Sequence, residues 1–206
     1  MAKAGQGAVI GGLEGIAASL PREGRGLPPV ELWNPPFCGD IDMRIASDAT
    51  WFYQKTPIGR PSLVKLFASI LKREGDKYFL VTPVEKVGVV VEDVPFLAVE
   101  LKVVEPKQDV LRYDLAGRVL RFRTNVDDWV EAGPEHALRF EPEPTGGLKP
   151  YLHVRRELWA RVTRALFYDL VELGEEREVE GRAMFGIVSA GEFFAMAEAS
   201  AVREFS

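Results

Sequence analysis

The sequence predicts an α+β protein made of two small domains. Apolar residues recur at helical spacing in two segments, 62–74 and 156–173, which predicts one strong helix in each half. Short segments of alternating apolar and polar residues, such as 41–45, surround both helices and predict strands. Pro95 separates the two groups of elements. We therefore expect an N-terminal extension over 1–28, an α+β domain over 29–95 and a second domain over 96–206.

Composition limits the classes of partner. The chain has 206 residues with 26 Lys and Arg against 31 Asp and Glu, a net charge of −5, which disfavours general binding of duplex nucleic acid. The single cysteine, Cys38, excludes an intrachain disulfide and suits a reducing compartment. Glu14 and several glycines interrupt the apolar N-terminus, and no segment has the roughly 18–20 apolar residues of a membrane span. We expect a cytoplasmic protein without a membrane partner.

The first domain is predicted to begin with a β-hairpin over 41–54, turned by the sequence SDAT. Ser62 is a candidate N-cap for the helix that follows, and Gly75 is expected to end this helix at C′. Two strands, 78–83 and 85–93, complete the domain. A short amphipathic helix over 9–20, weakened by glycines, is expected in the extension.

The second domain is predicted to hold about six strands, followed by a long helix over 156–173 that Gly174 ends. We expect an antiparallel sheet that this helix closes at one end. The charged segment 175–182 is expected at the surface, and the apolar tail 184–197 is expected to pack back onto the body. The strands are predicted over 96–105, 109–114, 118–125, 127–132, 136–141 and 150–154.

Each half also carries an acidic turn beside a tryptophan, SDATW at 47–51 and VDDW at 126–129. This is weak support for an internal duplication, because such signals recur by chance.

Four segments together resemble the bacterial DUF1285 family of uncharacterised proteins, and the resemblance covers about residues 30–196. It implies a two-domain α+β fold with an internal duplication and a C-terminal domain similar to a pleckstrin-homology (PH) fold. It also implies a ligand site at the domain interface, for a nucleotide-like molecule, and a role in signal transduction, but no catalytic residues. The segments are PPFCGDIDMRIASDATWFYQKTPIGRPSLVKLFASIL, YFLVTPVEKVGVVVEDVPF, YLHVRRELWARV and FGIVSAGEFFAMA.

The chain departs from the family pattern at two turns. Ala49 and Ala190 stand where such sequences usually have glycine. Because alanine tolerates positive φ poorly, we expect the turn at Ala49 to be of a different type.

The common catalytic and cofactor motifs are missing from the sequence. The glycines over 5–12 fit no phosphate-binding loop, and His136, His153 and Cys38 lack the spacing of metal ligands. Asp127 and Asp128 are adjacent, so their carboxylates are expected to point apart. We predict no cofactor and no metal, and we leave an unrecognised hydrolase or isomerase as an open alternative.

A basic and aromatic cluster at the start of the helix predicted over 156–173 is the strongest candidate site. Arginine forks suit phosphate or carboxylate, aromatic rings stack on bases, and a helix N-terminus offers donors to an anion. The alternative is that the arginines are solvated or paired with glutamates. The cluster consists of Lys149, Tyr151, His153, Arg155, Arg156, Arg161 and Arg164.

The first domain offers a second group. Arg60, fixed between Gly59 and Pro61, is predicted to face Tyr53 or Trp51, although the two aromatic residues could equally pack as core. Glu85 and Asp93 either end a strand or orient an arginine.

These observations favour a non-enzymatic sensor that binds a small anionic, nucleotide-like ligand between the domains. A protein–protein interaction module is the alternative from another class. The predicted ligand-binding residues are Tyr53, Arg60, Glu85, Asp93, Tyr151, Arg155 and Arg161.

Overall fold

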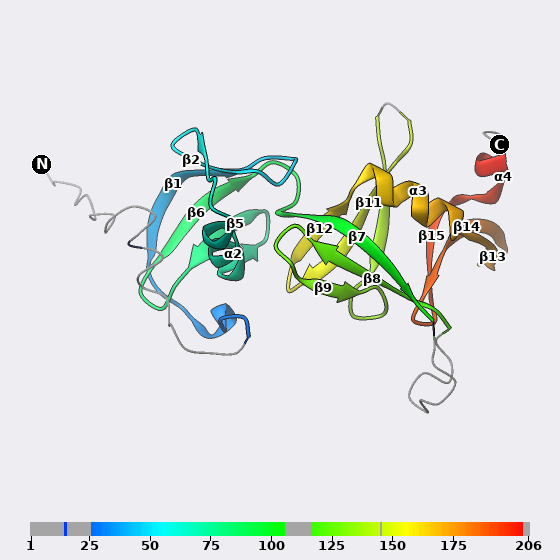
Figure 1. Cartoon of the computed structure of the whole chain (residues 1–206), viewed down its shortest axis with the longest axis horizontal. Helices are drawn as coiled ribbons and strands as arrows, with labels where there is room; N and C mark the ends of the chain where they lie inside the picture. The colour runs from blue at the N-terminus through cyan, green and yellow to red at the C-terminus, as the bar shows by residue number, and fades with distance from the viewer. Residues whose placement is uncertain (1–14, 16–25, 106–116, 145, 204–206) are drawn as a thin grey trace, which may run out of the picture. The chain divides into compact units, whose positions relative to one another are not determined.

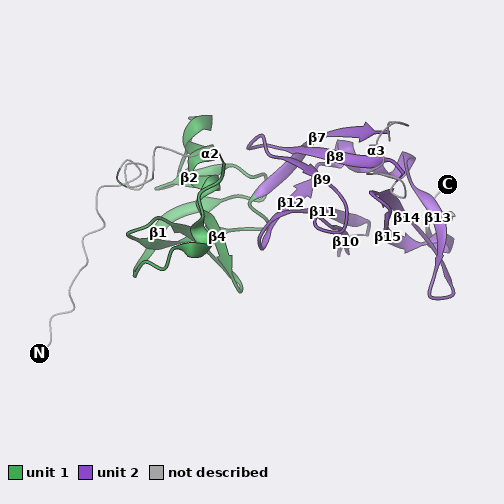
Figure 2. Ribbon diagram, turned by 90° about the horizontal axis from the view of Figure 1, so that it is seen from below, with its two compact units in different colours: residues 1–95 green, residues 96–206 purple. Residues whose placement is uncertain are grey.

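The computed structural model describes residue 15 and residues 26–105, 117–144 and 146–203. The chain is mostly β and divides between Pro95 and Phe96 into two compact units, which we call unit 1 and unit 2 (Figure 2). The helix expected over 9–20 lies almost entirely outside the described residues, and the strand expected over 109–114 lies wholly outside them.

The described part of unit 1 forms one mixed six-stranded sheet in the order β3-β2-β1-β6-β5-β4, which is accompanied by helix α2 (Figure 1). The sheet consists of two antiparallel three-stranded meanders, joined where β1 and β6 run parallel. The elements are η1 (Val30–Leu32), β1 (Phe37–Ile45), β2 (Trp51–Tyr53), β3 (Thr56–Pro57), α2 (Pro61–Ser69), β4 (Leu71–Glu74), β5 (Lys77–Val81) and β6 (Lys86–Val91).

The predicted hairpin is confirmed, because β1 and β2 pair antiparallel with Ile45 opposite Trp51. In its turn, Ala49 has φ 60 and donates its N–H to Ala46 O. The alanine therefore adopts the left-handed conformation that glycine would favour, at a cost of roughly 1–2 kcal/mol. That the turn differs in type from the glycine-containing turn stays a prediction.

Helix α2 is shorter than predicted. Pro61 occupies its first turn, where a missing N–H costs nothing, and Phe67 is buried and stacks on Trp51 with ring centroids 6.3 Å apart. The helix ends at Ser69 because Leu71 begins strand β4, which pairs with β5. Gly75, with φ 60, serves the β4–β5 turn and not a helix C-terminus.

Unit 2 contains a second mixed six-stranded sheet, β10-β11-β12-β7-β8-β9, and a separate antiparallel sheet, β13-β14-β15 (Figure 1). A purely antiparallel sheet was predicted, but the first sheet is mixed because β12 and β7 are parallel. The elements are β7 (Phe96–Val104), β8 (Val119–Thr124), β9 (Trp129–Glu131), β10 (Leu138–Pro142), β11 (Leu148–Arg155), β12 (Leu158–Val162), α3 (Arg164–Glu172), β13 (Glu175–Val179), β14 (Arg182–Ser189), β15 (Glu192–Glu198) and α4 (Ala199–Arg203).

The long helix predicted over 156–173 is wrong in its first half. Residues 158–162 form strand β12, in which Leu158, Ala160 and Val162 are buried and alternate with more exposed residues. Within the predicted segment only α3 is helical, and Phe167 of this helix packs against Phe140 of β10. Pairing of β12 with both β11 and β7 outweighs the helical spacing of the apolar residues.

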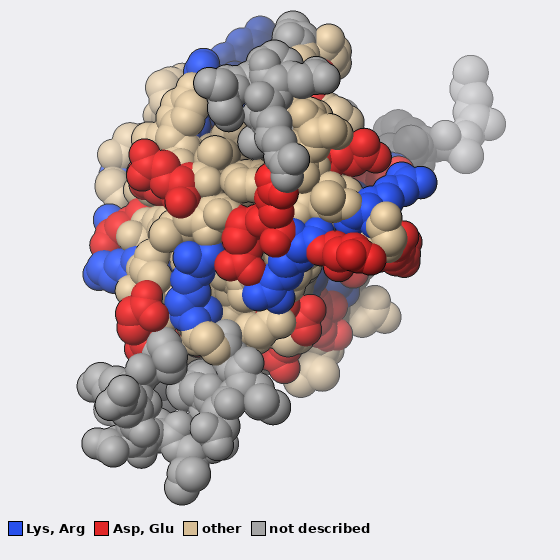
Figure 3. Space-filling view, turned by 90° about the vertical axis from the view of Figure 1, so that its right-hand side faces the viewer, with Lys and Arg blue, Asp and Glu red and all other residues tan. Residues whose placement is uncertain are grey.

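The apolar tail forms β14 and β15 and is tied to the body by Ser189. This side chain is fully buried; its hydroxyl accepts the N–H of Leu120 at 2.8 Å and donates to Ala132 O at 2.6 Å. Strand β13 and its turn are exposed, as predicted for the charged segment. Acidic and basic side chains are interspersed on this end of unit 2 (Figure 3), with pairs such as Glu175–Arg177 at 2.6 Å.

The two six-stranded sheets share one topology: two consecutive meanders joined through a parallel pair, β1 with β6 and β7 with β12. The two acidic turns also share a hydrogen-bond pattern. Ala49 donates its N–H to the carbonyl of Ala46, and Ala46 donates its N–H to Thr50 O. In the second turn, Asp127 and Thr124 make the equivalent bonds, to Thr124 O and Asp128 O. However, the two turns belong to hairpins at different places in this topology, since one joins β1 to β2 and the other joins β8 to β9.

None of the described helices is long and apolar enough to cross a membrane.

Acid is expected to weaken unit 1 through Glu92. Its carboxylate accepts the N–H of Ser47 at 2.9 Å and a hydrogen bond from Arg44, and these bonds lower the pKa of Glu92. A depressed carboxyl pKa contributes stability above the unfolded value of about 4.3, and this contribution is lost as pH falls through the folded pKa. Urea midpoints of the wild type at pH 7 and pH 3 should therefore differ by more than those of Glu92→Gln. Glu85→Gln is the control and should keep the wild-type difference; equal differences in wild type and Glu92→Gln would refute the role of Glu92.

Candidate ligand-binding face of unit 2

The seven predicted site residues fall in both units. Tyr53, Arg60, Glu85 and Asp93 belong to unit 1, and the other three belong to unit 2. We describe each group by itself.

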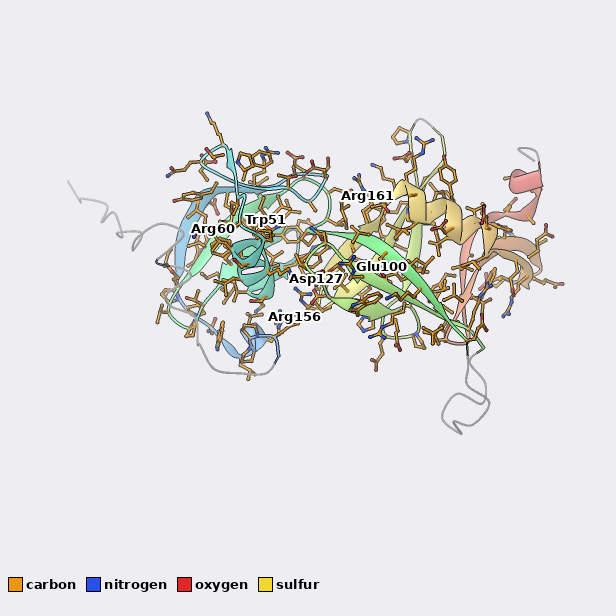
Figure 4. The ribbon with its side chains drawn as sticks, in the orientation of Figure 1. Trp51, Arg60, Glu100, Asp127, Arg156 and Arg161 are labelled. Carbon is orange, nitrogen blue, oxygen red and sulfur yellow. The ribbon has the colours of Figure 1, made fainter. Side chains whose placement is uncertain are left out.

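Arg60 lies at the N-cap of α2, where its carbonyl accepts the N–H groups of Leu63 and Val64 (Figure 4). Its side chain is exposed and makes no ion pair with any residue that the structure describes. Trp51 is buried in the core, whereas Tyr53 is half-buried at the end of β2. Of the aromatic pair, only Tyr53 therefore remains accessible to a ligand.

Glu85 and Asp93 flank strand β6 and are half-buried. The backbone of Glu85 closes the β5–β6 turn: its N–H donates to the buried Thr82 hydroxyl at 3.1 Å, and its carbonyl accepts the Thr82 N–H at 2.9 Å. This fits the structural alternative for Glu85. That either carboxylate orients an arginine stays a prediction.

Arg155 has a carboxylate partner within unit 2. Its guanidinium forms an ion pair with Asp128 and lies over the Phe96 ring, 4.8 Å from the centroid, and only 11% of the side chain is exposed. A ligand anion would compete with Asp128 for this arginine. The neighbouring Asp127 pairs instead with Arg123 at 2.8 Å, so the two adjacent carboxylates do point to different partners.

Tyr151 and Arg161 are brought together. The register of the β11–β12 hairpin places them directly opposite each other, and the β10–β11 register places Arg139 opposite Tyr151 on the other side. Cross-strand neighbours share one face of a sheet. Further along the same face, His153 is opposite Trp159. We call Arg139, Tyr151, His153, Trp159 and Arg161 the basic–aromatic face.

Arg139 contacts two aromatic rings through its guanidinium group. Its guanidinium carbon is 4.2 Å from the Trp159 centroid and 5.0 Å from the Tyr151 centroid. Nε lies 3.2 Å from a Glu141 carboxylate oxygen but makes no hydrogen bond within the described residues. The rings thus restrain the plane of the guanidinium, while part of its hydrogen-bonding capacity is unused.

His153 lies beside Trp159, and the other histidine of the chain, His136, lies beside His153. The His153 ring stacks on His136, with centroids 5.7 Å apart, and meets Trp159 edge-on at 5.2 Å. Its Nδ1 is 2.9 Å from Glu135 O, and its Nε2 contacts Arg156 O. Because main-chain carbonyls engage both nitrogens, His153 supports the face and offers no metal ligand. No metal-binding group of three His, Cys, Asp or Glu occurs within the described ranges.

The predicted cluster is not at a helix start. Residues 149–161 lie on the β11–β12 hairpin, and α3 begins later, at Arg164, so its N-terminal donors are not part of the basic–aromatic face. Arg139 and Trp159 were missed by the sequence reasoning. The period-two burial of 158–162 was the available signal for Trp159, but finding Arg139 required the strand register.

The outer side of β7–β9 carries a balanced ionic network. Glu100 accepts a hydrogen bond from Arg123 at 2.6 Å and pairs with Lys102 at 3.2 Å, which together lower the pKa of Glu100. Bonds to Glu100 and Asp127 raise the pKa of Arg123. Figure 4 labels Glu100 and Asp127. Mutual neutralisation makes this network a weaker candidate for anion binding than the basic–aromatic face.

Comparison with known proteins gives a family without an assigned activity. Two family models match: the N-terminal domain of DUF1285, a domain of unknown function, over residues 28–94, and the DUF1285 C-terminal domain, of a protein of unknown function, over 95–196. No curated protein matches the chain.

Two solved structures are similar. A DUF1285 family protein from Silicibacter pomeroyi DSS-3 is 47% identical, with a TM-score of 0.80 over 93% of this chain and 98% of that one. A second, from Shewanella baltica OS155, is 31% identical, with a TM-score of 0.48 over 64% of this chain and 91% of that one. Because the family models span most of its length, the chain belongs to the DUF1285 family.

Proposed function

We propose that this chain is a non-enzymatic protein that binds a small anionic, nucleotide-like ligand on the basic–aromatic face. The observation that carries the proposal is the contact of the Arg139 guanidinium with the rings of both Tyr151 and Trp159, with Arg161 opposite Tyr151. A guanidinium held in plane loses little conformational freedom when it binds a phosphate or carboxylate through two parallel hydrogen bonds.

The neighbouring groups support a nucleotide-like ligand. Arg161 supplies a second cation on β12, on the other side of β11 from Arg139, and the Trp159 ring supplies an aromatic surface of the kind on which bases stack. Carboxylates reduce the net positive charge, since Glu141 pairs with Arg139 and Glu143 lies 3.7 Å from Lys149. This arrangement favours a small ligand with one or two anionic groups over a nucleic-acid backbone.

Calorimetry against a panel of mono- and dinucleotides tests the proposal. Arg139→Ala and Arg161→Ala are each expected to weaken the tightest-binding member about 10- to 100-fold, the effect of one lost charge-assisted hydrogen bond. Arg177→Ala is the matched control, because Arg177 pairs with Glu175 on the exposed strand β13 and should leave binding unchanged.

Two results would refute the proposal: no nucleotide binds, or both arginine variants bind like the wild type. Arg60→Ala belongs in the same series. A loss of affinity in this variant would show that unit 1 also contributes to binding, as the sequence predicts.

A protein–protein interaction module is the second candidate. Helix α3 buries only Leu170 fully, and Tyr168 and Val171 remain exposed on it. Tyr168 and Val171 are i, i+3 neighbours on the helix surface, and contiguous exposed apolar patches mark partner surfaces. A partner captured by the wild type but not by Tyr168→Ala, and not displaced by nucleotides, would favour this function.

The shared topology of the two six-stranded sheets supports an internal duplication. We keep a PH-like relationship of unit 2, a role in signal transduction and a cytoplasmic location as parts of the proposal.

A further inference from the structure

A pocket lies within unit 2, beside the edge strand β9 and its neighbour β8. Its volume is about 570 Å³, within the range of small-molecule sites. None of the residues of the basic–aromatic face lines it. The lining residues are Arg121, Trp129, Val130, Glu131, Ala132, Gly133, Pro134, Glu135, His136 and Ala190.

The wall of this pocket pairs opposite charges at close range. Arg121 of β8 is directly opposite Glu131 of β9, and Arg121 Nε is 3.8 Å from a Glu131 carboxylate oxygen. About half of each side chain is exposed, so water screens the attraction between the two charges and the ion pair stabilises the fold only weakly. A ligand that offers a carboxylate to Arg121 and an ammonium to Glu131 could therefore separate the two at little cost.

An aromatic side chain lies next to this ion pair. Trp129 is 37% exposed, and the guanidinium carbon of Arg121 is 5.1 Å from its ring centroid. Lys102 lies over the same ring at 4.4 Å, and Glu135 adds a second carboxylate to the pocket wall. The pocket thus combines a cation, carboxylates and an apolar surface.

The base of the pocket is made of small residues. Gly133 and Ala190 meet there, and a methyl group added to Gly133 would lie 3.0 Å from the Ala190 Cβ. A methyl group at position 133, in the β9–β10 turn, would therefore require Ala190 in the β14–β15 turn to move by a few tenths of an ångström. Any larger side chain would push the two turns apart or fill the base.

From this geometry we propose that the pocket binds a zwitterion of the α-amino-acid class, free or as a short peptide. The ligand carboxylate binds Arg121, its ammonium binds Glu131, and its side chain contacts Trp129. A simple anion is disfavoured, because binding Arg121 would take from Glu131 its partner in this ion pair, whereas a zwitterion supplies a new partner to both. The proposal is independent of anion binding on the basic–aromatic face.

Ligand-observed NMR and calorimetry with free amino acids and dipeptides test this proposal. At least one member is expected to bind about tenfold more tightly than its N-acetyl form and its C-terminal amide, each of which lacks one charge. Arg121→Gln should abolish the preference for the acid over the amide. Glu131→Gln should abolish the preference for the free amine over the N-acetyl form.

Three controls sharpen the result. Arg177→Gln and Glu175→Gln alter an exposed ion pair elsewhere in unit 2 and should leave binding unchanged. Gly133→Ala keeps every charge but fills the base, and it should weaken binding of the larger members first. The proposal is overturned if no member binds, if the modified forms bind as well as the free zwitterions, or if both Gln variants of the pocket keep wild-type preferences.

Discussion

Replacing Ser189 by alanine is expected to lower the free energy of unfolding of unit 2 by about 3 kcal/mol. The buried hydroxyl joins β14 to Leu120 of β8 and to Ala132 after β9. Its removal leaves a buried N–H and a buried carbonyl without this partner, and each such group costs about 1–3 kcal/mol. Urea denaturation measures the loss, and hydrogen exchange of the Leu120 amide should accelerate in the variant.

Thr163→Ala provides the control for this substitution. Thr163 is the N-cap of α3 in the same unit, but its hydroxyl makes no capping hydrogen bond. We expect a change within about 0.5 kcal/mol of wild type. If Ser189→Ala proved as mild as Thr163→Ala, Ser189 would not be the link between the three-stranded sheet and the main sheet.

Replacing Asp128 by alanine is expected to destabilise unit 2 by about 2–3 kcal/mol, near the lower end for a broken buried ion pair. Arg155, which is mostly buried over Phe96, would lose its ion pair with Asp128. Asp128→Asn keeps the shape without the charge and should cost less. Both free energies follow from denaturant titration at neutral pH.

The exposed pair Glu175–Arg177 is the reference, and Glu175→Ala should change stability by less than about 1 kcal/mol. An equal effect of Asp128→Ala and Glu175→Ala would show that Arg155 is not a structural arginine. Such a result would return Arg155 to the set of candidate ligand residues.

Local patterns predicted much of the fold correctly. The alternation over 41–45 and the SDAT turn were sufficient for the β1–β2 hairpin, because register follows from which residues are buried. Five of the six strands before α3 were also expected, whereas β12 was predicted as part of a helix. The sixth predicted strand, 109–114, lies wholly outside the described residues. The three-stranded sheet of the tail was expected only as a packed apolar segment.

Tertiary pairing explains the two wrong helix boundaries. Leu158 and Val162 fit both a helix and a strand, and only the neighbouring strands β11 and β7 decide between them. Leu71 likewise fits the helical stripe of α2 but pairs with Leu80 of β5. Arg156, with φ 51 in the β11–β12 turn, is a non-glycine residue that gave no turn signal.

The same cause limited the candidate site. Tyr151 and Arg161 were identified from residue type, but they were placed at a helix start. Arg139, twelve residues before Tyr151 in the sequence, is its cross-strand neighbour only because β10 pairs with β11. Residue type alone therefore identified part of the basic–aromatic face, and the remaining residues could be found only from the strand register.

The affinity of Arg139→Lys for the tightest-binding nucleotide tests the central claim most directly. Lysine keeps the charge but lacks the planar fork that Tyr151 and Trp159 hold in place, so we expect binding at least about tenfold weaker than wild type. Wild-type affinity in Arg139→Lys and also in Arg139→Ala would contradict the assignment of the basic–aromatic face as the ligand site.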